Sequence, residues 1–303
     1  SLNWQKRRNC VTCHTNMPYL MARPALSAAM PDSGEVRTFF EDYYLTRWEK
    51  GKKKPEKPYR PVVIGAALAF NDAQTTGTLS EVARKTLDLM WTTQGENGAW
   101  KWAKCGWAPM EIDDHYGVTL AVLATGIAPN GYARTESAKA GVEKVRKYLK
   151  SYPAPSLHHR IMIAWASLRI GGLMEKKERE KVIDTMLSKQ LANGGWSTPS
   201  FLADWKAFER KDGKPHDVNS SDAYGTGLAL MVAREMGVPA KDERLQKGVA
   251  WLKSNQRESG KWFSRSPVKD SKHYFTNTGC AFALLGLQAC GALPGWPFET
   301  AQK

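Results

Sequence analysis

Two kinds of helical segment alternate along most of this chain. Beyond residue 33, nearly apolar stretches are separated by stretches with many charged residues, and neither kind shows the strict alternation of a β-strand. A helix that is apolar all round belongs inside a protein, whereas an amphipathic helix belongs on its wall. The pattern therefore predicts an all-α protein of about five helical hairpins. The apolar segments are 61–71, 114–127, 157–170, 221–236 and 276–290, and the charged segments are 34–49, 79–91, 136–151, 176–190 and 242–256.

The apolar segments resemble one another, which indicates an internal repeat. YGVTLA at 116–121 parallels YGTGLA at 224–229 and TGCAFA at 278–283. Repeats of roughly 40–65 residues are typical of solenoids and of closed rings of hairpins. An open solenoid would expose one face of each inner helix to water, which their apolar character disfavours. We therefore expect a double-layered (α/α) toroid with the charged helices outside.

A second repeat, Q-x-x-x-G-x-W, follows three of the charged segments. Its copies are QGENGAW at 94–100, QLANGGW at 190–196 and QRESGKW at 256–262. Glycine permits a sharp exit turn, tryptophan packs beneath it, and glutamine can bond to free backbone groups at the helix end. We interpret these motifs as structural staples and assign them no catalytic role.

The segment Cys10-Val11-Thr12-Cys13-His14 matches C-x-x-C-H, the attachment signature of haem c. On a helical turn the two thiols share one face and reach one porphyrin, and the adjacent histidine can bind its iron. A redox dithiol or half a zinc site has the same cysteine spacing, but no second Cys/His pair and no βαβ context accompanies it. The motif predicts one covalent haem c on Cys10 and Cys13, with His14 as the proximal ligand. We accordingly divide the chain into an attachment segment, 1–33, and a toroid, 34–303.

Two features resemble the squalene–hopene cyclase and prenyltransferase superfamily. The three Q-x-x-x-G-x-W copies resemble the QW motif of its cyclases, and this resemblance covers residues 34–303 and implies an (α/α) toroid. Glu111-Ile112-Asp113-Asp114 resembles the D-x-D-D motif of class II cyclases, whose central carboxylate protonates an alkene. Glutamate replaces the first aspartate here, and the known cyclases use two barrels where this chain has length for one. Together with C-x-x-C-H, the single toroid is similar to haem-bearing cyclase relatives of planctomycete-type bacteria.

The first residues of the inner helices should converge at one rim of a toroid. Aspartates at such positions also serve as simple helix caps, and histidines as hydrogen-bonded wall residues. We predict that His115 is the second iron ligand, because nearby carboxylates could orient its ring. Met110, Cys105, His159, His273 and a vacant iron position are the alternatives. The expected rim residues are Asp114, His115, Tyr116, His158, His159, Asp222 and Tyr224.

The formal charge of +14 is partly local. The basic stretch is either a solvated loop or a docking site for an acidic redox partner, and no nucleic-acid-binding module accompanies it. No run of about 18 apolar residues predicts a membrane span. No signal peptide is visible at Ser1, but haem c attachment usually occurs outside the cytoplasm, so we expect a periplasmic or otherwise exported protein. The stretch comprises Lys50, Lys52, Lys53, Lys54, Lys57 and Arg60.

Three functions fit these features. We favour a mono-haem c-type cytochrome that transfers electrons to a redox partner protein. A haem enzyme or gas sensor, with a small apolar ligand in the toroid cavity, is the first alternative. Cyclase-like acid catalysis on a terpenoid by Asp113 and Asp114 is the second.

Overall fold

The computed structural model describes residues 5, 7, 10–27, 30, 34–205, 208–271 and 275–293. Within these ranges every regular element is a helix, apart from one isolated bridge between Trp107 and Glu111. The predicted all-α class and the alternation of apolar and charged helices are confirmed. The apolar helices are α4 (Tyr59–Thr75), α6 (Asp114–Ile127), α8 (Leu157–Ser167), α11 (Ala223–Glu235) and α13 (Phe275–Ala289). The charged helices are α3 (Glu35–Tyr44), α5 (Glu81–Thr92), α7 (Glu136–Ser151), α9 (Lys176–Leu187) and α12 (Glu243–Ser254).

Shorter helical elements fill the connections. They are α2 (Asn16–Ala22), the 3-10 helices η1 (Arg23–Leu26) and η3 (Tyr132–Arg134), the π-helix η2 (Leu45–Glu49) and α10 (Thr198–Leu202). None of the helices in the described ranges is both long and apolar enough to cross a membrane.

The chain forms two compact units. Unit 1 comprises Ser1–Pro24 and Ser33–Val182, and unit 2 comprises Ala25–Asp32 and Ile183–Lys303. The boundary at residue 33 between an attachment segment and a toroid, which we drew from the motifs, stays a prediction.

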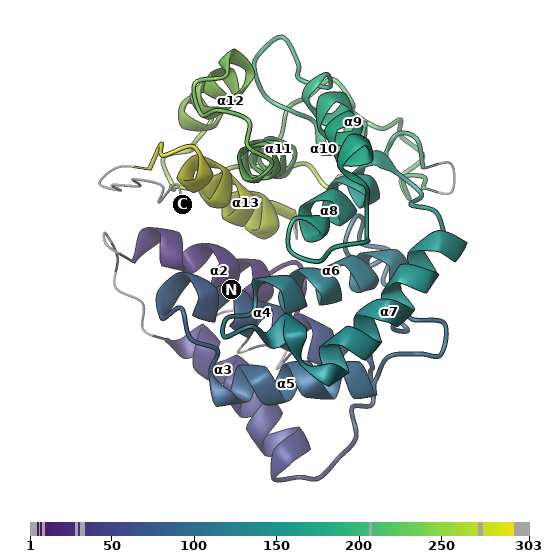
Figure 1. Cartoon of the computed structure of the whole chain (residues 1–303). Helices are drawn as coiled ribbons and strands as arrows, with labels where there is room; N and C mark the ends of the chain where they lie inside the picture. Colours follow the sequence, from purple (N-terminus) through teal and green to yellow (C-terminus); the bar gives the residue numbers. More distant parts are fainter. Residues whose placement is uncertain are drawn as a thin grey trace. The chain divides into compact units, whose positions relative to one another are not determined.

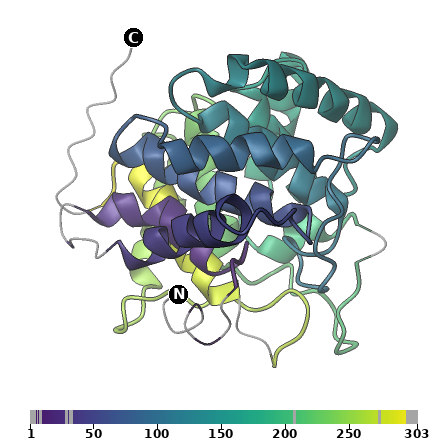
Figure 2. The ribbon, with the colours of Figure 1, turned by 90° about the horizontal axis from the view of Figure 1, so that it is seen from below.

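In unit 1, α4 and α6 pack side by side and α6 packs on α8 (Figure 1). Almost every side chain of these three helices is buried, as their composition requires. The charged helix α5 lies along α4 (Figure 2). Asp113 caps α6 by accepting from the Tyr116 amide, and Ser156 caps α8 by accepting from the His159 amide. These two caps bring polar side chains to the starts of neighbouring buried helices.

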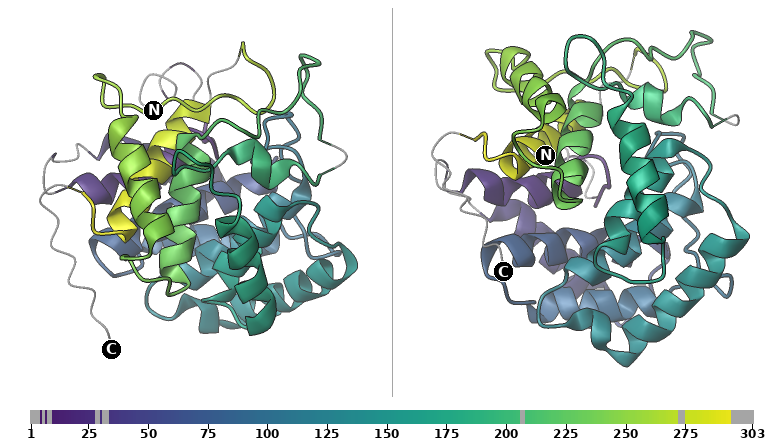
Figure 3. Two further views of the ribbon diagram at one scale, coloured as in Figure 1. Left: turned by 90° about the horizontal axis from the view of Figure 1, so that it is seen from above. Right: turned by 45° about the horizontal axis from the view of Figure 1, so that its top comes forward.

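Unit 2 is built around the pair α11 and α13, with α12 packed against both (Figure 3). Glycines bring the two backbones together. A Cβ at Gly286 would lie 2.8 Å from the Gly227 carbonyl oxygen, and one at Gly227 would lie 2.6 Å from the Ala283 nitrogen. Larger residues at these positions would push the helices apart.

The three Q-x-x-x-G-x-W motifs form the predicted staples. In each copy the indole N–H donates to a carbonyl in the preceding charged helix, and the glutamine amide donates to the carbonyl of the motif glycine. That glycine has a positive φ in every copy. The indole bonds join Trp100 to Met90 (3.0 Å), Trp196 to Met186 (2.9 Å) and Trp262 to Leu252 (2.7 Å).

Two of the glutamines also reach the next charged helix along the chain. Gln94, after α5, donates to the Gly141 carbonyl of α7 at 3.1 Å. Gln190, after α9, donates to the Arg244 carbonyl of α12 at 2.7 Å. The motif therefore joins successive hairpins as well as closing a turn.

Candidate functional site

The C-x-x-C-H segment lies in the turn before α2, not on the helical turn that we expected. Asn16, the first residue of α2, shapes this turn. Its Oδ1 accepts from the Thr12 amide at 2.7 Å, and its Nδ2 donates to the Cys10 carbonyl at 3.1 Å. The two cysteines are therefore placed by an asparagine-stabilised turn.

Glu111 faces this turn and contacts both residues at its centre. The Cys13 thiol donates to Glu111 Oε1 at 3.0 Å, and His14 Nε2 lies 3.5 Å from the same oxygen. Cys13 and His14 are both buried. Burial, reinforced by the charge of Glu111, raises the pKa of the Cys13 thiol well above its usual range. Burial also lowers the pKa of His14, against the pull of the carboxylate. Both groups are therefore held in their neutral forms.

The imidazole nitrogen that would bind iron and the thiol that would bond a vinyl group both face Glu111. No group of three or more His, Cys, Asp or Glu side chains in the described ranges is arranged to hold a metal ion. Covalent haem c on Cys10 and Cys13 stays a prediction from the motif, as do His14 and His115 as iron ligands, and an exported location. The intact mass of protein purified after export would test the attachment.

The structure brings His115 to other histidines and to tyrosine. Its ring centroid lies 5.2 Å from that of His159 and 5.9 Å from that of Tyr148, both edge-on. His158 lies edge-on to His159 at 5.9 Å. The rim residues of α6 and α8 therefore do come together, as the repeat predicted. Of the alternative iron ligands, Met110 is buried, Cys105 is exposed, and His273 lies outside the described residues.

A hydrogen-bonded chain runs through this cluster from Ser156 to Asp113. Ser156 Oγ lies 2.7 Å from His159 Nδ1, and His159 Nε2 lies 3.1 Å from Asp113 Oδ2. If the serine hydroxyl donates to Nδ1, the ring carries its proton on Nε2 and donates to the carboxylate. Ser156 and His159 are buried, whereas 24% of the Asp113 side chain is exposed. Asp113 is the solvent-accessible end of a buried relay.

The electrostatics of the cluster favour an ionised Asp113. Burial raises its pKa, but the hydrogen bond and charge of His159, together with the Tyr116 amide, outweigh burial and lower the pKa below its usual value. Burial lowers the pKa of His115 to about 4 and that of His158 to about 3, and the neighbouring His159 adds to both shifts. Two neutral histidines, His115 and His158, therefore lie near one partly exposed carboxylate.

Two tyrosines extend the cluster to the surface. Tyr148 and Tyr152, one helical turn apart at the end of α7, stack at 4.7 Å with an interplanar angle of 29°. Tyr148 is buried and Tyr152 is 50% exposed. Burial, with Asp114 and Asp113 nearby, raises the pKa of Tyr148 to about 12. We did not single out these tyrosines or Ser156 from the sequence, although a serine just before an apolar segment indicates a helix N-cap.

The other two rim aspartates have structural partners. Asp222 caps α11 by accepting from the Gly225 amide, and it also accepts from the amide and hydroxyl of Thr198. Its predicted capping role is confirmed. Asp114 accepts from the Trp102 amide and pairs with the exposed Lys104 at 3.3 Å. The α6 cap is Asp113, one residue before the position that we expected.

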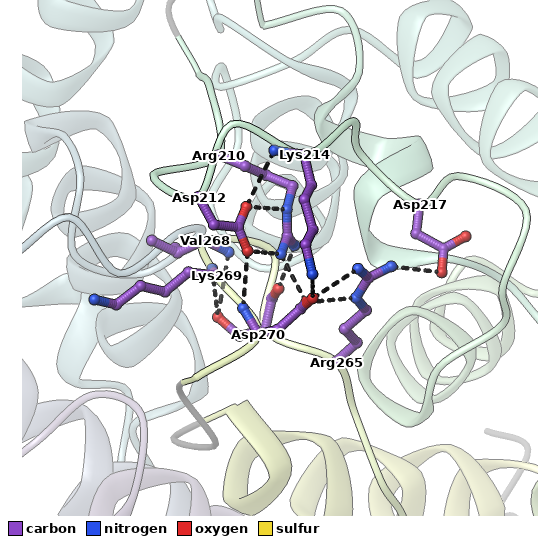
Figure 4. A network of polar contacts seen from close by, with 9 residues as sticks. Arg210, Asp212, Lys214, Asp217, Arg265, Val268, Lys269 and Asp270 are labelled. Atoms are coloured by element: carbon purple, nitrogen blue, oxygen red, sulfur yellow. Dashed lines mark hydrogen bonds and ion pairs between the residues drawn. The ribbon is translucent and has the colours of Figure 1, made fainter.

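Unit 2 holds a second polar cluster, centred on Arg210 (Figure 4). Arg210 pairs with Asp212 at 2.6 Å and Asp270 at 2.7 Å, and donates to the buried Ser266 carbonyl at 2.8 Å. Arg265 and Lys214 also bind Asp270. These partners join the loop before α11 to the loop after α12. The guanidinium bond lowers the pKa of Asp212 to about 2.

Comparison with known proteins supports the fold. No family model matches the chain, and neither does any curated protein. A solved structure described as a possible member of the GH105 family, from Klebsiella pneumoniae subsp. pneumoniae MGH 78578, matches it with a TM-score of 0.52. The two chains are 12% identical over 90% of this chain and 80% of that one. The likeness supports the (α/α) toroid class that the repeats predicted, and it carries no sign of a cyclase or a cytochrome.

The prediction of an electron-transfer cytochrome is wrong. The solved structure that shares the fold is described as a possible member of the GH105 family. In the turn that holds the C-x-x-C-H motif, Glu111 contacts the Cys13 thiol and His14 Nε2. A small apolar ligand and an acidic partner protein stay predictions from the sequence.

Proposed function

We propose that this chain is a hydrolase that acts on a saccharide, with Asp113 as its general base. The observation that carries the proposal is the relay from Ser156 through His159 to a partly exposed Asp113. A catalytic base needs an accessible lone pair, and it needs a partner that holds the carboxylate in place. Asp113 has both, and the start of α6 adds a backbone amide that favours its negative charge.

The chemistry follows from the protonation state. Because the pKa of Asp113 is lowered, its carboxylate is ionised at neutral pH and can take a proton from a water molecule. The water oxygen then bonds to the anomeric carbon as its bond to the leaving oxygen breaks, the leaving oxygen takes a proton from solvent, and Asp113 later returns its own proton to solvent. His159 acts as a positioning residue, because its N–H orients the carboxylate and stabilises the charge before the proton is taken.

Two observations support a saccharide as substrate. The chain shares its fold with a structure described as a possible member of the GH105 family. The half-exposed ring of Tyr152, stacked on Tyr148 beside the cluster, offers a flat aromatic face for the apolar side of a sugar ring. Acid catalysis on an alkene is disfavoured, because it needs a protonated carboxyl and Asp113 is held ionised.

The test compares Asp113→Asn with Asp242→Asn on a panel of chromogenic glycosides and oligosaccharides. Asparagine is also a good helix cap, so both variants should fold. Asp242 is the matched control, since it caps α12 without a histidine partner. We expect Asp113→Asn to lower kcat/KM by about 10²–10⁴-fold. Asp242→Asn should leave it within about twofold, because surface changes of this kind have small effects.

His159→Gln tests the positioning role. Loss of the imidazole should lower kcat and should move the acidic limb of the pH–rate profile upward, because the pKa of Asp113 returns toward its usual value. A purely structural role for His159 would lower activity without moving that limb. Wild-type protein that cleaves no saccharide, or Asp113→Asn that behaves like Asp242→Asn, would contradict the proposed function.

A further inference from the structure

A cavity of about 220 Å³ lies in unit 1 where the π-helix η2 meets the basic stretch. Residues from α3, η2, the following loop and the start of α4 contribute to its wall. π-helical turns are rare and occur frequently at functional sites. Lys52, in the loop, adopts a positive φ of 47°, which costs energy for a residue other than glycine. Two unusual backbone features thus flank one cavity.

The wall of this cavity is strongly basic. Arg47, Lys53, Lys54 and Arg60 line it, with Glu56 as the one acidic lining residue. None of the four cations forms an ion pair with another residue in the described ranges. Four cations and one carboxylate around a concave surface leave an excess of positive charge, and the resulting potential attracts anions.

Polar atoms at the wall also lack partners. The hydroxyl of Tyr43 and the Nε of Arg60 are buried, and neither has a hydrogen-bond partner. Tyr43 as a whole is 4% exposed. A buried donor without an acceptor is costly.

Two of these cations, Arg47 and Arg60, lie over one aromatic ring. The guanidinium carbon of Arg47 lies 4.4 Å from the centroid of the Tyr43 ring, and that of Arg60 lies 5.5 Å from it. Trp48 packs edge-on against the same ring at 5.6 Å. Both guanidinium groups thus lie near one ring and line one cavity, and planar, fork-shaped donors of this kind suit carboxylate and phosphate groups.

We infer that this cavity is a binding site for the oxyanion group of a small molecule, either a carboxylate or a phosphate. Arg47 and Arg60 supply the charge-assisted hydrogen bonds, Tyr43 supplies the ring over which both guanidinium groups lie, and Lys53 and Lys54 neutralise the remaining charge. The inference stands apart from the proposed function, because none of these residues belongs to the Asp113 cluster.

Calorimetric titration of the whole chain tests the site, with inorganic phosphate, glucuronate and neutral glucose as separate probes at one ionic strength. We expect saturable millimolar or tighter binding of phosphate, glucuronate or both, and none of glucose. Binding of glucuronate alone would identify a carboxylate ligand, and binding of phosphate alone would identify a phosphorylated one. Failure of both anions, or equal binding of glucose, would overturn the inference.

Variants locate the binding. Arg60→Gln should weaken binding by at least about tenfold, because it removes a charged donor. Lys57→Gln, the matched control, removes a charge from the same stretch outside the cavity wall and should change binding less than about twofold. Tyr43→Phe keeps the aromatic ring and should change binding less than about twofold without destabilising the free protein, since its buried hydroxyl has no partner to lose. Equal effects of Arg60→Gln and Lys57→Gln would show nonspecific attraction and would also overturn the inference.

Discussion

The two units use the same hairpin and the same tryptophan staple, but the Asp113 cluster of unit 1 and the Arg210 cluster of unit 2 neutralise their carboxylates differently. In unit 1, Asp113 is paired with His159 beside two more buried histidines. In unit 2, Asp212 and Asp270 are paired with Arg210 and other permanent cations (Figure 4).

This difference separates a titratable cluster from a permanent one. Arginine stays charged at every relevant pH, so the unit 2 network serves to join loops and changes little between pH 5 and 8. The unit 1 cluster titrates at lower pH, because burial lowers the pKa of His115 to about 4 and that of His158 to about 3. A pH-dependent contribution to stability is therefore expected from unit 1, and a fixed cross-link from unit 2.

The largest expected effect tests the tryptophan staple, which both units contain. Trp196→Ala should destabilise the protein by about 3–5 kcal/mol, because the buried indole leaves a cavity and its bond to Met186 is lost. Trp100→Ala, the matching change in unit 1, should cost a similar amount. Urea unfolding followed by circular dichroism measures both. A cost under about 1 kcal/mol in either unit would show that the staple does not act alike in the two.

The next prediction concerns the pH dependence of stability that the unit 1 histidines should cause. His115 and His158 have folded pKa values of about 4 and about 3, below the usual 6.5, so the unfolded chain takes up protons first as the pH falls. Stability should therefore fall between pH 7 and pH 4, by about 2 kcal/mol per histidine at pH 5. Urea unfolding at pH 7 and pH 5 measures this fall.

His158→Leu is the variant that assigns the effect. The difference in unfolding free energy between pH 7 and pH 5 should shrink by about 2 kcal/mol, the contribution of one histidine, even if the variant is less stable at both pH values. An unchanged difference would mean that His158 is not the buried neutral group that the structure describes.

A smaller effect tests the fixed cross-link. Arg210→Ala should destabilise unit 2 by about 1–3 kcal/mol, because the buried Ser266 carbonyl loses its charged donor. This cost should be the same at pH 7 and pH 5, since the lowered pKa of Asp212 keeps that carboxylate ionised at both. Lys214→Ala is the control, because Lys214 is exposed and its pair with Asp270 contributes little. A pH-dependent cost for Arg210→Ala would remove the distinction between the two clusters.

Much of the fold was predictable because its signals are local. The apolar segment 114–127 coincides with α6, and the charged segment 136–151 coincides with α7. Side-chain period and helix caps act over a few residues, so they are visible along the chain. The staples were predictable for the same reason, since each motif spans seven residues and bonds to the helix just before it.

The site was only partly predictable. The repeat predicted that Asp114, His115 and His159 lie close together, but it did not show which aspartate would contact His159. Asp113 takes that place because it is the cap of α6, and capping turns its side chain toward the start of the neighbouring helix α8. Asp114, one residue later, turns toward the Trp102 amide instead.

The sequence by itself determined the helix class, the hairpin repeat and the staples, because these depend on residues that are close along the chain. Only the tertiary structure decided the partners of the reactive groups. Glu111 meets Cys13 across 98 residues, and His159 meets Asp113 across 46. The C-x-x-C-H spacing shows which side chains lie close together. The chemistry of each side chain also depends on the group that faces it, and tertiary packing brings that group from elsewhere in the chain.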